Sequence, residues 1–353
     1  MTTSTTSVIT SAQPVLSKPL EVNVTDYRSA LRKALAEGMT EDARVIILGE
    51  EVGRYGGAYA VTKGLYEHFG ASRVLDTPIS EAAIVGTAIG AAMTGLRPIA
   101  ELMYVDFAGL AMDQIANQAA KIRYMFGGQV GVPMVLRMQG GTGRSAGAQH
   151  SQSLEAWLMH VPGLRVYMPA TVSDAYYLLK AALQSDDPVM FLEHKSLYTH
   201  KGELEDDALP VGQAAVRKSG TDITLISYSR MLHRTLEAAE LLAQEDNINA
   251  EVIDLRTLNP LDSETLAESV SRTGRAVVIS EDTFTGSVAA ELVARLQVDA
   301  FDFLEAPILR VCGEDIPIPV SPELEAAAVP DVTRIVQAAR TALGSRQTTG
   351  AAH

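Results

Sequence analysis

The sequence predicts an α/β protein of two doubly wound domains, each built on a mostly parallel sheet covered by helices. Short runs of β-branched and aliphatic residues alternate with helical segments twice along the 353 residues. These runs are mostly apolar, as expected for strands buried on both faces of a parallel sheet. An acidic stretch without periodicity separates the two alternations, and a chain with 47% hydrophobic residues can bury two cores.

Composition and periodicity predict the domain boundaries. The first 20 residues lack periodicity, and the stretch Gly202–Asp207 is polar and acidic, as is typical of an arm and of a linker. The expected organisation is a disordered N-terminal arm over 1–20, a first domain over 21–200, a linker over 201–213, a second domain over 214–343 and a solvated tail over 344–353.

The elements predicted for the first domain nearly alternate between strand and helix. Apolar runs bounded by Gly, Pro or charged residues predict strands over Val45–Gly49, Arg97–Met103, Val132–Arg137, Leu164–Pro169 and Pro188–Glu193. Helical spacing predicts helices over Tyr27–Leu35, Thr62–Phe69, Ala82–Leu96, Phe107–Arg123 and Ser173–Leu183. Strands connected by helices in this way pair in parallel.

The second domain repeats the alternation after the acidic stretch. Its predicted strands are Ile223–Ser227, Ala250–Asp254, Ala276–Ser280 and Ile308–Val311. Its predicted helices are Leu232–Ala243, Ser263–Ser271, Ser287–Val298 and Val332–Leu343. We therefore expect a second, compact doubly wound sheet of ordinary domain size.

The composition excludes several classes of partner. The 29 Lys and Arg residues against 43 Asp and Glu give a formal net charge of -14, so the chain lacks the basic surface that nucleic acids and anionic membranes require. The longest apolar run, Ala82–Leu96, is shorter than the roughly 20 residues of a membrane-spanning helix. The single cysteine, Cys312, excludes an internal disulfide framework and fits a reducing compartment. Residues 1–17 show neither an apolar signal core nor the arginines of a transit peptide, so the expected location is cytoplasmic.

The segment Thr77–Glu81 opens a run of small apolar residues that continues to Met93. One interpretation is a capped helix start, in which Thr77 is the N-cap, Pro78 takes the first helical position and Glu81 complements the helix dipole. The other is that Glu81 holds a proton at a buried site, with the Gly and Ala face of the helix allowing a cofactor to approach. The two interpretations are compatible, because a helix start can also contact a ligand.

A glycine-rich loop follows the strand predicted over Val132–Arg137. Its segment Gly141–Ala146 fits the G-x-G-x-x-A pattern of dinucleotide-binding turns, so an NAD-binding protein is one alternative. The loop does not open a helix at once, and no Asp or Glu stands about twenty residues further on, which counts against a nucleotide site. The glycines allow the backbone before His150 to fold tightly around a ligand.

His150 and Phe107 are two further candidates. A histidine titrates near neutral pH, so His150 in a cleft can exchange a proton or steady an oxyanion; a histidine bonded to its loop neighbours is the simpler interpretation. Phe107 fits either a core position or a ring that stacks on a flat heterocycle. No Walker loop occurs, and the spacing of the other histidines does not match a zinc site.

Several motifs together resemble a known family: Gly49-Glu50-Glu51-Val52, Asp76–Glu81, Gly95–Ile99, Asp113-Gln114, Gln149–Ser153, Pro162–Leu164 and Asp254–Thr257. In order and spacing, from about Val22 to Leu343, they resemble the β subunit of the first, decarboxylating component of 2-oxo-acid dehydrogenase complexes. This family is transketolase-like and uses thiamine diphosphate in α2β2 heterotetramers. The resemblance implies a transketolase-like pyrimidine-binding domain followed by a transketolase C-terminal-like domain.

The resemblance assigns roles to four of the residues. Glu81 matches the catalytic glutamate that hydrogen-bonds N1′ of the cofactor's aminopyrimidine. Phe107 matches the aromatic residue that packs on the aminopyrimidine, and Glu50 matches a carboxylate near it. His150 matches a catalytic histidine that faces the substrate and the incoming lipoyl group.

The metal sites that the resemblance implies lie partly outside this chain. The family binds Mg2+ and diphosphate through a G-D-G…N-N motif, and neither Gly-Asp-Gly nor Asn-Asn occurs here. The resemblance therefore implies that a separate α subunit binds Mg2+ and the diphosphate, with the active site at the subunit interface. It also implies a potassium site at Met134, Ala182, Leu183, Ser185 and Asp187, where Ser185 replaces an aspartate that is usual in the family.

The implied activity is cleavage of a substrate C–C bond and transfer of the acyl group to lipoamide, together with an α subunit and a lipoyl acyltransferase core. Arg123–Gly128, Gly143–Ala146 and Glu193-His194-Lys195 look similar to acetoin-cleaving and pyruvate-type bacterial members. Pyruvate and acetoin are therefore the expected substrates. The alternative is a docking or scaffold subunit of such a complex whose catalytic site has decayed.

Overall fold

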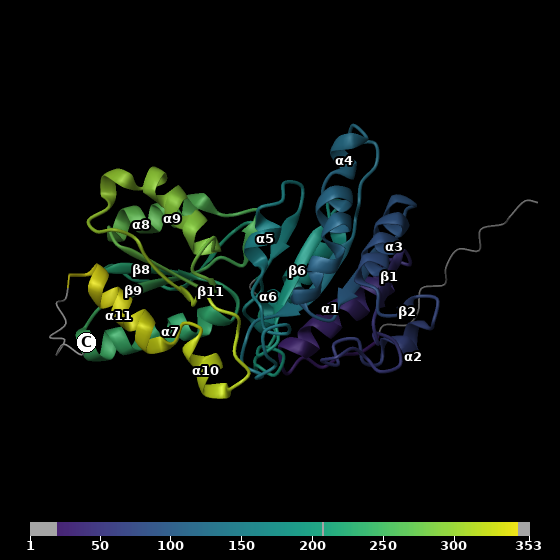
Figure 1. Ribbon diagram of the computed structural model, residues 1–353, viewed down its shortest axis with the longest axis horizontal. Helices are drawn as coiled ribbons and strands as arrows, with labels where there is room; N and C mark the ends of the chain where they lie inside the picture. Colours follow the sequence, from purple (N-terminus) through teal and green to yellow (C-terminus); the bar gives the residue numbers. More distant parts are fainter. Residues whose placement is uncertain (1–19, 207, 345–353) are drawn as a thin grey trace, which may run out of the picture.

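A computed structural model describes residues 20–206 and 208–344 of the chain. Except for Leu20 and Gly344, the arm predicted over 1–20 and the tail predicted over 344–353 lie outside these residues. Within the described ranges, two α/β halves lie side by side along the longest axis of the molecule (Figure 1). None of the helices in these ranges is long and apolar enough to cross a membrane.

The first half is built on a seven-stranded sheet in which all strands but one run parallel. Its strands are β1 (Val45–Gly49), β2 (Val74–Asp76), β3 (Arg97–Leu102), β4 (Val135–Gly140), β5 (Arg165–Tyr167), β6 (Val189–His194) and β10 (Thr257–Asn259). The strand order is β10-β5-β6-β4-β3-β1-β2, and β10 is the antiparallel edge strand.

Helices cover both faces of this sheet. They are α1 (Tyr27–Glu41), α2 (Leu65–Phe69), α3 (Glu81–Met93), η1 (Val105–Ala111), η2 (Asp113–Ala119), α4 (Ile122–Met125), α5 (Glu155–Met159) and α6 (Val172–Gln184). Consecutive strand residues face opposite layers: Val135 of β4 packs in the core beneath α1 and α6, whereas Leu136 packs beneath α3 and η1. The apolar runs of the sequence are explained by this burial on two faces.

The second half has a five-stranded sheet in the order β12-β11-β8-β9-β7, with β7 antiparallel at the edge. Its strands are β7 (Ala215–Lys218), β8 (Ile223–Ser227), β9 (Ala250–Asp254), β11 (Ala276–Thr283) and β12 (Leu309–Gly313). Its helices are α7 (Ser229–Asp246), α8 (Ser263–Thr273), α9 (Val288–Asp299), η3 (Phe301–Phe303), α10 (Pro322–Ala327) and α11 (Val332–Ala342). Both sheets confirm the predicted fold class.

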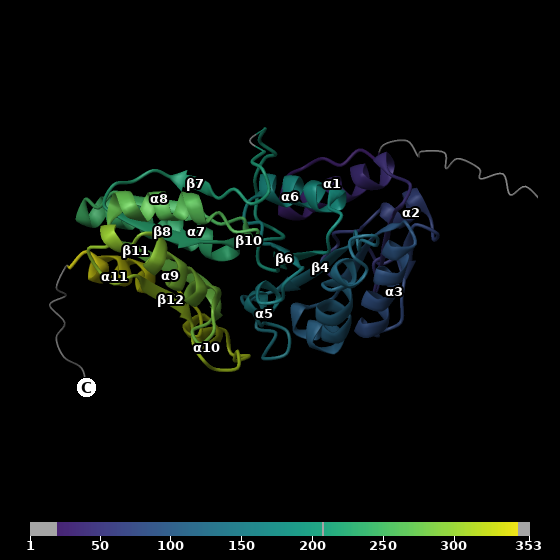
Figure 2. The same ribbon diagram turned by 90° about the horizontal axis from the view of Figure 1, so that it is seen from above.

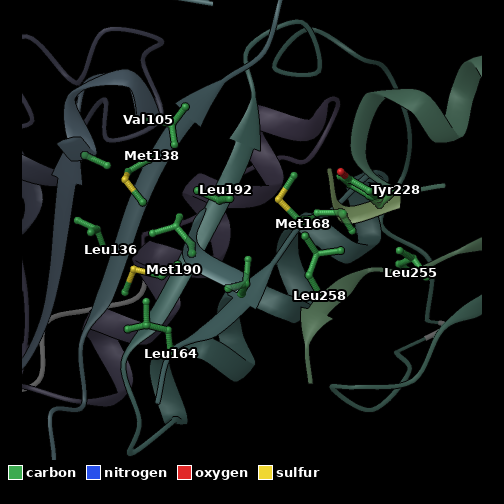
Figure 3. Close-up of a cluster of buried hydrophobic side chains, with 14 of the residues drawn as sticks. Val105, Leu136, Met138, Leu164, Met168, Met190, Leu192, Tyr228, Leu255 and Leu258 are labelled. Atoms are coloured by element: carbon green, nitrogen blue, oxygen red, sulfur yellow. The ribbon is translucent and has the colours of Figure 1, made fainter. Parts of the chain in front are cut away.

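The two halves share a continuous hydrophobic core (Figure 3). Tyr228 and Leu255 of the second half lie in one cluster with Met168, Leu192 and Leu258 of the first sheet and its flanking segments. β10 reinforces this contact, because it follows the second-half strand β9 in sequence yet pairs with β5 of the first sheet. Figure 2 shows β10 between the two halves. The chain therefore passes from the first sheet to the second at the linker predicted over 201–213, and it returns to the first sheet once more at β10.

The prediction of one long helix over Phe107–Arg123 is wrong. The segment forms the 3-10 helix η1, the π-helix η2 and the single turn α4. Buried residues are three apart at Val105, Ala108 and Ala111, and four apart from there to Ala119. A three-residue period keeps one face of a 3-10 helix buried, so the spacing from Val105 to Ala111 fits η1.

The predicted helix cap at Thr77 is also wrong. The N-cap of α3 is Ser80, and Glu81 is the first helical residue. Thr77 donates its backbone N–H to Gly49 O at 2.9 Å, which continues the parallel pairing of β2 with β1. The strand pairing holds the backbone extended at Thr77, so the helix starts later.

Candidate functional site

The candidate residues lie at one edge of the first sheet, where its parallel strands end. Glu50 follows β1, Glu81 follows β2 after a short extended segment, and Phe107 lies in η1 after β3. His150 lies in the long loop after β4. Because β2 and β3 flank β1, the strand order reverses at β1, and ligands of doubly wound sheets bind outside the carboxyl ends of strands at such a point.

Glu81 and Glu50 form a pair of buried carboxyl groups at this edge. Glu81 is 7% exposed, and its side chain makes no hydrogen bond or ion pair with the rest of the described chain. Glu50 is 8% exposed, and burial followed by repulsion from the Glu81 charge raises the pKa of Glu50. Two such groups side by side are suited to holding a proton for a ligand.

Three buried polar atoms around this edge lack a hydrogen-bond partner within the described residues: Glu50 Oε1, Thr77 Oγ1 and Gln114 Oε1. The backbone bond to Gly49 places Thr77 beside β1, and Gln114 Cγ lies 3.8 Å from where a Cβ on Gly86 of α3 would stand. A buried polar atom without a partner costs about 1–3 kcal/mol unless a ligand satisfies it. Carboxyl, hydroxyl and amide oxygens fit a flat heterocycle with N–H groups, such as an aminopyrimidine.

Aromatic rings bring His150 and Phe107 together. Their ring centroids are 5.4 Å apart with an interplanar angle of 87°. Tyr104 packs edge-on against both, with centroids 4.8 Å from His150 and 6.0 Å from Phe107, and its hydroxyl lies 3.2 Å from that of Tyr59. The structure thus places the predicted histidine and the predicted aromatic residue in one aromatic cluster.

Known proteins share both halves of this arrangement. Residues 23–201 match the transketolase pyrimidine-binding domain, and residues 212–335 match the transketolase C-terminal domain. The pyruvate dehydrogenase E1 component subunit beta of Rhizobium meliloti is 46% identical over 333 residues, which cover 93% of this chain and 72% of that protein. The β subunit of the acetoin:2,6-dichlorophenolindophenol oxidoreductase of Cupriavidus necator is 47% identical over 323 residues, which cover 88% of this chain and 95% of that protein. The chain belongs to the E1 β-subunit family.

Solved structures show the fold of this E1 β subunit in more distant proteins. A split-gene transketolase, described as an inactive β4 tetramer, superimposes with a TM-score of 0.74 at 23% identity and covers 92% of this chain and 100% of its own. A transketolase from Leishmania mexicana gives a TM-score of 0.69 at 15% identity, with 95% of this chain matching 48% of that one. The predicted transketolase-like fold and family resemblance are confirmed.

The glycine-rich loop of this E1 β subunit is bonded to the second half of the chain. Thr142 donates its N–H and its hydroxyl to Glu281 Oε1 at 2.7 and 2.8 Å, and Ser145 donates its N–H to Glu325 at 3.1 Å. No helix begins within Gly141–Ala146. The NAD alternative needs such amides for a nucleotide phosphate, and here they are bonded to carboxylates, so the geometry does not support it.

The same loop contains a second pattern that its geometry does not support. Gly143–Gly147 reads G-x-S-x-G, and Ser145 has a left-handed φ of 52°, as in the turn that carries a hydrolase nucleophile. That turn leads directly from a strand into a helix, whereas this loop reaches its next helix only at Glu155. Within the described residues, no histidine hydrogen-bonds to the Ser145 hydroxyl. The strained backbone at Ser145 instead presents its N–H to Glu325.

The predicted potassium site lies at the opposite edge of the first sheet, and a cationic side chain already occupies it. Arg97 Nη1 donates to Leu183 O at 3.2 Å and to Ser185 O at 2.9 Å. Ala182 O accepts a hydrogen bond from Ser185 N at 3.2 Å. A potassium ion bound to the same carbonyls would lie next to the guanidinium charge.

The remaining predicted potassium ligands are also engaged. Met134 O accepts from Val189 N at 2.9 Å. The carboxylate of Asp187 pairs with Arg123 at 2.6 Å and with Arg165 at 2.8 Å. The residues of this turn therefore do not fit a potassium ion, and the structure supports Arg97 as the cation that closes it. Nowhere in the described ranges does a group of three or more His, Cys, Asp or Glu side chains come together to hold a metal ion.

Several residues at the site escaped the sequence-based reasoning. Lys195, Tyr104 and Gln114 lie at the same sheet edge, but Lys195 and Gln114 stand out in the sequence only within family-like motifs, which give neither of them a role. Lys195 directly follows the buried strand β6 and is itself 0% exposed. The sequence did contain a signal for Lys195, because a polar residue directly after a buried parallel strand lies at the ligand-binding edge of the sheet.

Proposed function

We propose that this chain supplies the aminopyrimidine-binding half of a thiamine-diphosphate-dependent E1 enzyme and acts with an α subunit. The observation that carries the proposal is the unpaired carboxyl pair, Glu81 and Glu50, at the same sheet edge as the aromatic cluster of Phe107 and His150. Paired carboxylates stabilise a fold, whereas buried unpaired ones need a ligand. The names of the E1 β relatives point to the same chemistry.

The residues of this chain divide the work of such a site. Glu81 holds a proton at N1′ of the aminopyrimidine. Glu50 is a second carboxyl group nearby, and its raised pKa favours its neutral form. Phe107 packs on the pyrimidine face, and His150 faces the substrate. Bound thiamine diphosphate supplies the carbon nucleophile that this chain lacks.

The partner subunits complete the proposal. No Gly-Asp-Gly or Asn-Asn motif occurs in the chain, so Mg2+ and the diphosphate are assigned to the α subunit of an α2β2 heterotetramer. The acyl group then passes to lipoamide on an acyltransferase core. Pyruvate and acetoin both remain as substrates, because the chain is 46% and 47% identical to relatives named for each.

The test is turnover by the chain reconstituted with its α subunit. Glu81→Gln should lower kcat by about 100-fold or more, because positioned proton transfer contributes about 10²–10⁴-fold. Glu268→Gln, an exposed carboxylate on α8, is the matched control and should keep wild-type activity. Near-wild-type turnover by Glu81→Gln would sink the catalytic assignment.

The choice of substrate needs a second measurement on the wild type. Assays with pyruvate, acetoin and branched-chain oxo acids rank kcat/KM for the three substrate types. A complex that assembles with the α subunit and acyltransferase core but turns over none of them supports the docking or scaffold alternative.

A further inference from the structure

Lys195 is a buried cation without a carboxylate partner. Its side chain follows β6 at the edge that carries the candidate site and is 0% exposed. Within the described residues it forms no salt bridge, and burial lowers the pKa of its ammonium group. A buried ammonium group costs free energy unless its protons are bound, so its contacts indicate what it does.

The ammonium group binds the segment that carries His150. Lys195 Nζ donates to the backbone carbonyl of His150, and to Ser151 Oγ at 3.1 Å. It also lies 5.8 Å from the centroid of the Tyr104 ring, the ring that packs against the imidazole of His150. An ammonium group with three donors can hold the carbonyl, the hydroxyl and the ring face together.

A second anchor, the Asp106 carboxylate, holds the next residue of the same segment. Asp106 Oδ1 accepts from the backbone N–H of Gln152 at 3.2 Å and from its side-chain amide at 3.0 Å. Three consecutive residues, His150 to Gln152, are thus fixed by one cation and one carboxylate. The loop before them contains Gly141, Gly143 and Gly147, all at positive φ, and so supplies little stiffness of its own.

We propose that Lys195 is a positioning residue for His150, and that its ammonium group holds residues 150 and 151 so that the imidazole stays packed against Tyr104 and Phe107. Its effect on turnover rests on the proposed function, but its effect on the loop does not. Lysine suits the position because its compact ammonium group fits a carbonyl and a hydroxyl at once, whereas the planar guanidinium of arginine needs a wider set of acceptors.

The first experiment measures amide hydrogen exchange in the isolated chain. Lys195→Met keeps the length of the side chain and removes its donors, and it should speed exchange at His150 and Gln152 about tenfold or more, the change expected when a charged hydrogen bond is lost. Lys195→Arg should lie closer to the wild type. Lys218→Met, which removes a surface lysine paired with Glu240, is the control and should leave this loop unchanged.

Unchanged exchange in folded Lys195→Met would overturn the proposal. If that variant fails to fold, Ser151→Ala removes one acceptor without altering the charge. It should raise exchange at His150 by a smaller factor, about threefold, and no change in this variant would equally count against the anchor.

The second experiment is a double-mutant cycle in the reconstituted enzyme. Lys195→Met should lower kcat at least tenfold with little change in KM, and Lys195→Arg should recover part of it. If Lys195 acts through His150, adding Lys195→Met to His150→Asn should cause little further loss, whereas additive losses would contradict a positioning role. A wild-type complex without turnover would refute the proposed function alone, since the exchange experiment does not depend on activity.

Discussion

The carboxyl-terminal edges of the two sheets carry a similar set of acidic residues, but in different states. At the first edge, Glu50 and Glu81 are buried, and among the described residues their side chains pair with no cation. At the second edge, Asp254 pairs with Arg217 at 3.0 Å, and Glu281 bonds to His194 at 3.0 Å and to Thr142. Within the second set, Glu281 joins the two halves of the chain, whereas the first set remains available to a ligand.

This difference shows that acidic residues at a strand edge do not by themselves indicate a site. Both edges have the same geometry, because both belong to mostly parallel sheets covered by helices. What separates them is whether each buried carboxyl group already has a hydrogen-bond partner. Substitutions should therefore destabilise the fold at the paired positions and leave it unharmed at the unpaired ones.

The largest expected effect is at Glu281. Glu281→Ala should lower the free energy of unfolding by about 3–5 kcal/mol, because it leaves three buried donors without their acceptor: the His194 ring, and the amide and hydroxyl of Thr142. The pKa of Glu281 is held below its usual range by His194 despite burial, so its contribution is present above about pH 4.5 and is lost as the pH falls. Urea unfolding at pH 7 and pH 3 measures both effects. An equal loss at the two pH values would contradict this account.

The next effect extends the comparison to the opposite edge of the first sheet. Arg97→Gln should cost about 1.5–3 kcal/mol, since it removes charged hydrogen bonds to Leu183 O and Ser185 O. Wild-type thermal unfolding should be the same in KCl as in NaCl at equal ionic strength. Arg44→Gln, which breaks an exposed pair with Asp42, is the control. A saturable stabilisation of the wild type by K+ over Na+ would restore the potassium site.

A smaller effect concerns Glu155, which accepts a hydrogen bond from Tyr228 at 2.9 Å across the two halves. Burial, followed by the nearby Asp282 charge, raises the pKa of Glu155 to about 8. When folding raises the pKa of a carboxyl group in this way, the folded protein loses stability as the pH rises from about 4.5 to about 8. Glu155→Gln should therefore raise Tm by a few degrees at pH 8 and change it little near pH 4.5, since 1 kcal/mol shifts Tm by about 2–4 °C.

The exposed Glu268→Gln substitution on α8 is the reference for Glu155→Gln. The informative quantity is the difference in Tm between variant and wild type across the pH range. A difference that shrinks as the pH rises would show that Glu155 is ionised and stabilising, contrary to its burial beside Asp282.

The smallest effect is expected at the unpaired edge itself. Glu50→Gln in the isolated chain should leave Tm at pH 8 unchanged or slightly higher, because it removes a carboxyl group whose ionisation is disfavoured by burial and by the Glu81 charge. Thermal unfolding of the isolated chain without cofactor is the measurement. A clear loss of stability would mean that Glu50 is bound within the fold, and the contrast between the two sheet edges would fail.

Much of the fold could be predicted from local pattern. The strands predicted over Ile223–Ser227 and Ala250–Asp254 have the observed bounds, because each is a short run rich in aliphatic residues between polar turn segments. β10 could not be found in this way: it has three residues, and its partner β5 lies some ninety residues earlier in the chain. Pairing of this kind is decided by tertiary contact, which a local pattern does not contain.

The site could be predicted only in part. Glu81, Glu50, Phe107 and His150 were each visible as a polar or aromatic residue near a strand end, and the family resemblance assigned their roles. Their closeness depends on strand order, which the pattern alone leaves open. The anchoring of His150 by Lys195 was not visible, because it depends on the path of a glycine-rich loop whose backbone has many possible conformations.

The position of β10 also affects how the chain is made. The edge strand β5 cannot pair with β10 until residue 259 has left the ribosome. At usual rates of synthesis, residue 259 follows β5 after about 5–20 s. During that interval a row of unpaired backbone groups is exposed, a template for pairing with another nascent chain. A fragment that ends at residue 200 would keep that exposed edge permanently, so the first half of this subunit needs the second as a cover against aggregation.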